Sequence, residues 1–411
     1  MDAGPQLPQP PAAGDDPGLA GGSTRFALRG IKGWAWAPEQ YLDIIPWLPT
    51  VRFNFLMNCY ASMCAIEDRP WGTPGCNRWW EPLPAWKARA FEGVVAACRD
   101  AGIDFCFSMN PNLFSTRFAR PERPADVDAL WAHYAWMQGL GVRWFNVSLD
   151  DVGEGIDASA QCRLVNVLVG RLRLSDPGAR MIFCPTIYWG YAREPGEGRY
   201  LDAVARELDP AVLVFWTGDA VVTPRITRRA AEAFREAVGH SLVIWDNYPV
   251  NDDQPTMHLG PVTGRDPDLP EVAEGYMANP MRRQNRFNRL ALATCAEFAW
   301  DARSYDPSRS IRRAIEALAE TDEQRTVLTA LVEAYPGMLQ FGQNQYFNPA
   351  RDRFARLLGT SREPASDFAR AMADLARRFR TAFGREYAAE RATLEDDVRW
   401  MERQLPAENF P

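Results

Sequence analysis

Residues 142–155 read VRWFNVSLDDVGEG, and this stretch predicts a buried strand with a reactive end. The apolar run from Val142 to Leu149 is typical of a strand covered on both faces, as in a parallel sheet. It stops on two neighbouring carboxylates, Asp150 and Asp151. Like charges side by side raise each other's proton affinity, so such a pair is costly to bury. An isolated Asp-Asp pair is more often a helix cap beside a solvated charge, and the surrounding chain decides between the two interpretations.

Similar apolar stretches alternate with amphipathic segments along the first 300 residues. The expected strands cover 25–33, 51–58, 103–110, 142–151, 180–188, 211–217, 241–248 and 274–279. The helical patterns between them include 38–48, 85–101, 126–139, 158–174, 198–208 and 224–237. Buried strands alternating with helices indicate a parallel sheet, and eight such units predict an α/β fold of the (β/α)8 barrel type. A doubly wound open sheet is the main alternative, but no GxGxxG follows the first strand.

The expected strands finish on polar or aromatic side chains. These ends are Gly33, Asn58, Asn110, Asp150 with Asp151, Tyr188, Trp216 with Thr217, Asp246 with Asn247, and Asn279. In a barrel they converge on one rim, where active sites lie, although Asn and Asp also end strands in ordinary turns. Two long connections, 59–83 and 249–273, are expected to form walls or lids of a pocket.

Composition divides the chain into three expected parts: a disordered tail over 1–24, a barrel over 25–303 and a helical domain over 304–411. The third part carries helical patterns at 307–335, 349–358 and 364–405, and QFGQNQYFNPA (340–350) is interpreted as a connecting loop. The N-terminal segment lacks the basic and apolar regions of a secretory signal, and no apolar run is long enough to span a membrane. We therefore expect a soluble cytoplasmic protein.

Charge and rare residues exclude several classes of function. The formal net charge of −7 argues against nucleic acid or an anionic membrane as the main partner. The 8 cysteines are scattered and fit no zinc spacing, so we expect buried free thiols in a reducing compartment. The 3 histidines are dispersed. No metal and no cofactor are expected.

Several blocks, in order, resemble the O-GlcNAcase-type β-N-acetylglucosaminidases, glycoside hydrolase family 84, over roughly residues 25–300. The blocks are VSLDDVGE (147–154), FCPTIYWG (183–190), VFWTGDAVV (214–222), VIWDNYPVND (243–252), LGPVTGR (259–265) and MANPM (277–281). The resemblance implies a barrel that removes β-linked N-acetylglucosamine with retention. The substrate's own acetamide oxygen would attack the anomeric carbon and form an oxazoline, so no enzyme nucleophile is needed.

The resemblance also implies a role for each acid. Asp150 matches the carboxylate that orients and polarises the acetamide N–H, and Asp151 matches the general acid that later activates water. One acid has to be ionised while the other carries a proton. Adjacent residues of a strand point to opposite faces, so both acids can serve one site only if the chain bends at the rim. Gly153 and Gly155 would permit such a bend.

The remaining matched positions are implied to bind the sugar. Tyr188 would reach the acetamide, Trp245 would wall the acetyl pocket, and Asp252 would hold O4 and O6. The other implied contacts come from Asn247, Asn279 and the backbone of Gly33.

One position departs from the family pattern. The family carries a lysine after the second strand, whereas this region reads NFLMNCYASM and the chain has no lysine between Lys32 and Lys87. The expected GFYG block is GWAW (33–36), and Asn58, Arg69 and Arg78 are the candidates to replace the lysine. Two alternatives follow: a glycan-binding pseudoenzyme without turnover, and a hydrolase of a related 2-acetamido sugar.

Overall fold

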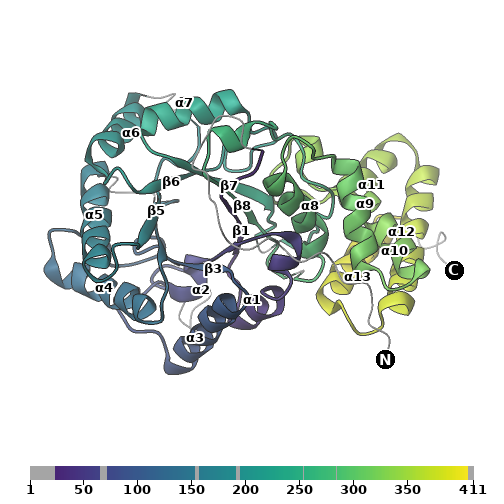
Figure 1. Ribbon diagram of the computed structural model, residues 1–411. Coiled ribbons are helices and arrows are strands. Elements are labelled where there is room, and N and C mark those ends of the chain that lie inside the picture. Colours follow the sequence, from purple (N-terminus) through teal and green to yellow (C-terminus); the bar gives the residue numbers. More distant parts are fainter. Residues whose placement is uncertain are drawn as a thin grey trace.

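Eight parallel strands close into a barrel in sequence order, with β1 paired to both β2 and β8 (Figure 1). The computed structural model describes residues 24–64, 72–152, 157–190, 195–252, 254–283 and 285–405. The strands are β1 (Leu28–Gly33), β2 (Phe55–Asn58), β3 (Asp104–Met109), β4 (Trp144–Ser148), β5 (Arg180–Cys184), β6 (Leu213–Trp216), β7 (Leu242–Pro249) and β8 (Gly275–Asn279). The predicted (β/α)8 barrel is confirmed, and several strands are shorter than expected, with β1 and β2 beginning later in the chain.

Alternation along each strand divides its side chains between the barrel interior and the helical layer. In β2, Phe55 and Met57 belong to the interior cluster, whereas Leu56 packs outward. In β4, Trp144 faces inward and meets Phe55 edge to face, with ring centroids 5.3 Å apart. Both faces are therefore apolar, which explains why these strands read as nearly continuous apolar runs.

Helices surround the barrel on its outer face (Figure 1). They are α1 (Pro38–Ile44), α3 (Ala85–Asp100), α4 (Pro124–Gly139), α5 (Ala158–Ser175), α6 (Pro195–Glu207), α7 (Arg228–Val238) and α8 (Asn288–Trp300). The short helix α2 (Tyr60–Cys64) follows β2 and begins with a residue of the barrel interior cluster. Two of these helices begin with a side-chain cap: at α5 the Asp157 carboxylate accepts the Ala160 N–H at 3.1 Å, and Thr227 caps α7 in the same way. Short 3₁₀ turns lie at Leu48–Val51 and Leu269–Glu271.

Five further helices lie on one side of the barrel, beyond α8 (Figure 1). They are α9 (Pro307–Leu318), α10 (Asp322–Ala334), α11 (Pro349–Thr360), α12 (Arg362–Phe383) and α13 (Ala388–Arg403), with a 3₁₀ turn at Leu339–Phe341. Phe287, which precedes α8, packs against Phe379 and Phe383 of α12, so one apolar cluster joins these helices to the barrel. The predicted boundaries at 24/25 and 303/304 stay predictions, and residues 1–23 lie outside the described part.

A buried ion pair fixes the end of β7. The Asp246 and Arg265 side chains are 2% and 1% exposed, and the guanidinium Nε donates to Oδ2 at 2.7 Å. The Tyr276 hydroxyl of β8 donates to the same oxygen at 2.6 Å. This carboxylate is therefore fully occupied by protein donors.

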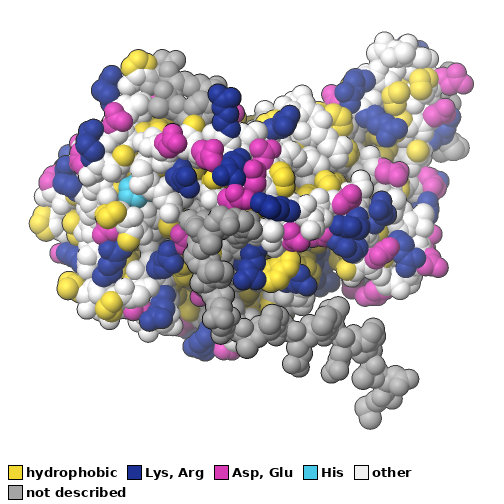
Figure 2. Space-filling view, turned by 45° about the horizontal axis from the view of Figure 1, so that its top comes forward, with side chains coloured by type: hydrophobic (Ala, Val, Ile, Leu, Met, Phe, Trp, Pro, Cys, Tyr) yellow, Lys and Arg dark blue, Asp and Glu magenta, His cyan; other side chains and the backbone are white. Residues whose placement is uncertain are grey.

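On the surface, Arg and acidic side chains are interspersed over the face shown in Figure 2. Among the helices described, none combines the length and the apolarity needed to cross a membrane.

Candidate active site

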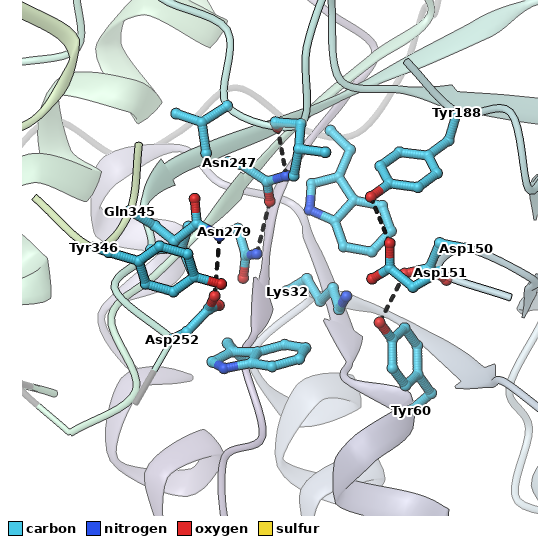
Figure 3. Close-up of a pocket in the computed structure, with 15 residues that line it drawn as sticks. Lys32, Tyr60, Asp150, Asp151, Tyr188, Asn247, Asp252, Asn279, Gln345 and Tyr346 are labelled. Atoms are coloured by element: carbon cyan, nitrogen blue, oxygen red, sulfur yellow. Dashed lines mark hydrogen bonds between the residues drawn. The ribbon is translucent and has the colours of Figure 1, made fainter. Parts of the chain in front are cut away.

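A pocket of about 320 Å³ opens at the carboxyl ends of the barrel strands (Figure 3). It brings together most of the site residues predicted from the sequence, namely Asp150, Asp151, Tyr188, Trp245, Asn247, Asp252 and Asn279. It also contains residues that sequence reasoning did not place there, including Lys32, Trp34, Tyr60, Gln345 and Tyr346. Carboxylates, amides and aromatic rings around one cavity are suited to a sugar, because rings cover its apolar faces and polar groups bind its hydroxyls.

The chain bends at the acid pair itself. Asp151 has φ 57°, a left-handed conformation that Asp tolerates better than most residues. Asp150 is 3% exposed whereas Asp151 is exposed to solvent, yet both line the pocket. The bend required by the strand pattern is thus present, and it lies at Asp151, ahead of the two glycines expected to permit it. Gly153 and Gly155 lie outside the described residues.

Each acid has its own tyrosine donor. The Tyr60 hydroxyl donates to Asp150 Oδ2 at 2.7 Å, and the Tyr188 hydroxyl donates to Asp151 Oδ1 at 2.8 Å (Figure 3). Asn110 holds the backbone at this turn, because its Nδ2 donates to the Asp150 carbonyl at 3.2 Å. The two carboxyl groups are therefore fixed separately, although they are neighbours in the chain.

Burial dominates the electrostatics of Asp150. Burial and the charge of Asp151 raise the pKa of Asp150 to about 6, while the Lys32 charge and the Tyr60 hydrogen bond act in the opposite direction. Asp150 is therefore mostly ionised at neutral pH and gains a proton in mildly acidic solution. A carboxyl group poised in this range is typical of catalytic sites.

Two asparagines form the adjoining wall. Asn279 Nδ2 donates to Asn247 Oδ1 at 2.8 Å, and Asn247 Nδ2 donates to the Val221 carbonyl at 2.7 Å. Within the described part of the chain, Asn279 Oδ1 and Trp245 Nε1 are buried without a hydrogen-bond partner. Buried polar atoms left in this state are costly, so this wall is prepared for a ligand that supplies the missing partners.

The side of the pocket that faces the acid pair includes residues from two distant parts of the sequence (Figure 3). Asp252 follows β7, and its Oδ2 accepts a hydrogen bond from Gln345 Nε2 at 3.1 Å (Figure 3). Gln345 and Tyr346 belong to the 340–350 segment, which the sequence predicted to be a connecting loop. The Gln345 carbonyl lies 3.3 Å from His258 Nε2, so the segment is tied to the 249–273 connection.

The matches to known proteins agree with this geometry. Residues 70–333 match the family model described as beta-N-acetylglucosaminidase. The chain belongs to the β-N-acetylglucosaminidase family. Protein O-GlcNAcase of Rattus norvegicus and that of Mus musculus are each 28% identical to it over 279 residues, covering 64% of this chain and 29% of the relative. The chain thus matches less than a third of the length of these curated relatives.

Solved structures share the fold. A structure titled CpGH84B superposes with a TM-score of 0.73 at 22% identity, covering 92% of this chain and 67% of the other. A point mutant of the Thermobaculum terrenum O-GlcNAc hydrolase gives a TM-score of 0.70 at 22% identity, covering 92% and 82%. The resemblance deduced from the ordered sequence blocks is therefore confirmed at the level of the family.

Of the residues proposed from the sequence to replace the lysine that is missing after β2, neither Asn58 nor Arg78 lines the pocket. Asn58 is buried and bridges β2 to β3, because its Nδ2 donates to the Ser108 carbonyl at 2.9 Å. Arg78 pairs with Glu81 at the surface, and Arg69 lies outside the described residues. The lysine that reaches the pocket is Lys32 of β1. Strand alternation could have revealed it, because Lys32 shares the inner face of β1 with Leu28.

Gly33 is not among the residues that line the described pocket. It is the next residue after Lys32, so strand alternation turns it toward the helical layer. The Tyr41 hydroxyl donates to its carbonyl at 2.9 Å, and a Cβ at Gly33 would lie 2.4 Å from the Trp36 ring. Close packing by Trp36 therefore explains the glycine, and a contact between its backbone and a sugar stays a prediction.

A metal centre has no clear location in the described part of the chain. Within it, no group of three or more His, Cys, Asp or Glu side chains is arranged to hold a metal ion.

Proposed function

We propose that the protein hydrolyses β-linked N-acetylglucosamine with retention, and that the sugar's own acetamide is the nucleophile. The observation that carries the proposal is the adjacent pair Asp150 and Asp151 at the pocket rim, each held by a separate tyrosine hydroxyl. The family to which the chain belongs supports the same activity. Such hydrolases need no carboxylate placed to attack the anomeric carbon.

Asp150 is suited to the acetamide. Its buried carboxylate accepts the acetamide N–H, orients the carbonyl oxygen toward the anomeric carbon, and stabilises the positive charge that develops on the acetamide. The bond from that oxygen to the anomeric carbon forms as the glycosidic bond breaks, which gives an oxazoline. A buried anion stabilises this charge more strongly than an exposed one, because water screens it less.

Asp151 is suited to proton transfer. It gives its proton to the departing glycosidic oxygen and then takes a proton from the water that attacks the anomeric carbon and opens the oxazoline. Two neighbouring negative charges repel each other, which favours a proton on one of the two acids, and the proposed roles require that this acid is Asp151 when the glycosidic bond breaks. The Tyr188 hydroxyl at 2.8 Å keeps the Asp151 carboxyl in one orientation through both steps.

The sugar hydroxyls meet the other walls of the pocket. Trp245 offers an apolar face to the acetyl methyl group, and Asn279 Oδ1 lacks a protein partner in the described part of the chain, so it accepts a sugar hydroxyl. Asn247 and Asp252 line the same cavity, and the proposed partner of O4 and O6 is Asp252. The 2-acetamido group and the sugar hydroxyls would therefore contact different sides of the pocket.

The natural substrate that we propose is a protein or small glycoside carrying β-N-acetylglucosamine. The relatives named Protein O-GlcNAcase support the protein substrate. We further propose a reducing compartment such as the cytoplasm, because the seven cysteines that can be described are all buried free thiols.

An aryl-glycoside panel tests the proposal. The purified protein should release the aryl group from the β-N-acetylglucosaminide, more slowly from the C4 epimer, and hardly at all from the β-glucoside without the acetamide. A folded protein that cleaves no 2-acetamido glycoside would overturn the proposed hydrolysis. Saturable binding of N-acetylglucosamine without cleavage would then select the pseudoenzyme, whereas preference for the epimer would select the related sugar.

A further inference from the structure

Lys32 is an unusual residue for the interior of a barrel. It lies on the inner face of β1, its side chain is 1% exposed, and it lines the same pocket as the acid pair (Figure 3). Its ammonium group has no hydrogen-bond partner among the described residues. A buried amine in this state is costly unless a bound ligand completes its contacts.

Aromatic rings surround the ammonium group. Lys32 Nζ lies 3.5 Å from the Trp245 ring centroid, 4.5 Å from that of Tyr60 and 5.5 Å from that of Trp34. The faces of such rings attract a cation but accept no conventional hydrogen bond, so they favour the charged form while leaving its donors available. The position of the amine is therefore fixed by rings that do not consume its N–H groups.

One of these rings, that of Tyr60, connects Lys32 to the acid pair. Tyr60 presents its ring to Lys32 and donates its hydroxyl to Asp150 Oδ2 at 2.7 Å. No ion pair joins Lys32 directly to a carboxylate of the described residues, so its charge acts on Asp150 through space. The ammonium group can thus influence the acid without occupying the oxygen that the substrate needs.

We propose that Lys32 is the cation of this site, which keeps Asp150 ionised at neutral pH and donates a hydrogen bond to an oxygen of the bound sugar. This assignment rests on the proposed hydrolysis of N-acetylglucosaminides. It places on β1 a function that the β-N-acetylglucosaminidase pattern places after β2, and it makes Lys32 a positioning residue for Asp150 as well as a ligand-binding one.

The groups facing Asp150 support this division of charge. They are Asp151 beside it, Lys32 of β1, Cys59 and Tyr60 after β2, and Cys184 and Tyr188 at β5. Burial raises the pKa values of both cysteines and both tyrosines, so these groups stay neutral near pH 7. Near Asp150 the charges are therefore those of the two carboxyl groups and of Lys32.

Three variants separate the two functions of Lys32. Lys32→Met removes the charge and the donor, Lys32→Gln keeps a donor without the charge, and Lys32→Arg keeps the charge. Losing a nearby positive charge favours the protonated carboxyl, so Lys32→Met and Lys32→Gln should move the acidic limb of kcat/KM upward by about one pH unit. Lys32→Arg should keep the limb in place, and Lys32→Gln should have a lower KM than Lys32→Met.

The control is the chain's other lysine. Lys87 lies on α3, away from the pocket, so Lys87→Met should leave both the limb and KM unchanged. An acidic limb that is the same in Lys32→Met, Lys87→Met and the unaltered protein would overturn the proposal, as would a limb fully restored by Lys32→Gln. Thermal unfolding should be followed for each variant to confirm that the folded protein is being compared.

A binding measurement keeps this test independent of hydrolysis. Asp150 has to be ionised to accept the acetamide N–H, so the affinity for free N-acetylglucosamine, measured by calorimetry between pH 5 and pH 8, should show the same upward shift in Lys32→Met. If the unaltered protein binds the sugar but cleaves no glycoside, the proposed function fails while this shift still decides the role of Lys32. Unchanged pH dependence of binding would contradict it.

Discussion

Two buried carboxylates of this barrel, one within β7 and one just after β4, differ in their bonding partners. Asp246 of β7 receives the Arg265 guanidinium at 2.7 Å and the Tyr276 hydroxyl at 2.6 Å. Asp150, after β4, receives the Tyr60 hydroxyl but no bonded cation from the described residues. Both are almost inaccessible, at 1% and 3% exposure, so the difference lies in their partners and not in their burial.

The comparison separates a structural acid from a functional one. The Asp246 carboxylate accepts hydrogen bonds from Arg265 and Tyr276. These bonds hold β7, β8 and the 249–273 connection together. The charge of Asp150 is left incompletely balanced beside Asp151, which costs stability in the empty protein. Such a cost is typical of a site that keeps its interactions for a ligand or a transition state.

The largest difference is expected from removing the acids themselves. Asp150→Asn and Asp151→Asn should each lower kcat/KM on an aryl β-N-acetylglucosaminide by about 10²–10⁴-fold, because the first loses acetamide polarisation and the second loses proton transfer. Steady-state kinetics measures this loss. If either variant kept most of the activity, the acid that it removes would not be catalytic.

Asp246→Ala should fail in a different way. It leaves the buried Arg265 guanidinium unpaired, so the free energy of unfolding should fall by about 3–5 kcal/mol. Urea denaturation followed by circular dichroism measures this change. A loss below about 1 kcal/mol, within the usual range of surface pairs, would show that the pair is not structural.

Stability should respond to Asp150→Asn with the opposite sign. The pKa of Asp150 is raised to about 6 from the ordinary 3.8, so the folded protein binds its proton more tightly than the unfolded chain does. Stability from this group is therefore present in acid and lost as pH rises through about 6. Asp150→Asn should raise the free energy of unfolding by roughly 2–3 kcal/mol at pH 7 and change it little at pH 4. Equal effects at both pH values would contradict the raised pKa.

A smaller effect is expected from the tyrosine donor. Tyr60→Phe removes a hydrogen bond that favours ionised Asp150, so the acidic limb of kcat/KM should rise by about one pH unit while activity at pH 8 falls less. Tyr200→Phe is a matched control, because that buried hydroxyl donates to Gln161 and not to the acid pair. If the acidic limb moved in Tyr200→Phe but not in Tyr60→Phe, the Tyr60 hydroxyl would not be what favours ionised Asp150.

The smallest effect is expected on the wall supplied by the C-terminal region. Gln345→Ala frees the Asp252 carboxylate from its amide donor, so KM should rise a few-fold with kcat little changed, as for an interaction made equally in the bound and transition states. Gln343→Ala alters an exposed residue of the same segment and serves as the control. A change in kcat alone would instead assign Gln345 to the chemical step.

Local patterns predicted the barrel because its strands are apolar on both faces, and the ordered blocks predicted the acid pair, Tyr188 and Asp252. The register of the barrel was harder to foresee. It turns Lys32 inward and Gly33 outward, so the interior lysine was overlooked. The contribution of Gln345 and Tyr346 depends on how α9–α13 are placed against the barrel, and no local pattern in the 340–350 segment determines that placement.

The direct test of acetamide participation is the rate at which aryl β-glucosaminides with progressively fluorinated N-acetyl groups are cleaved. Fluorine withdraws electrons from the acetamide oxygen and weakens it as a nucleophile, while the leaving group and the ring stay the same. The expected result is a steady fall in kcat/KM from acetyl to trifluoroacetyl, with little cleavage of the aryl β-glucoside. Rates that stay constant along the series would contradict nucleophilic attack by the substrate's own acetamide.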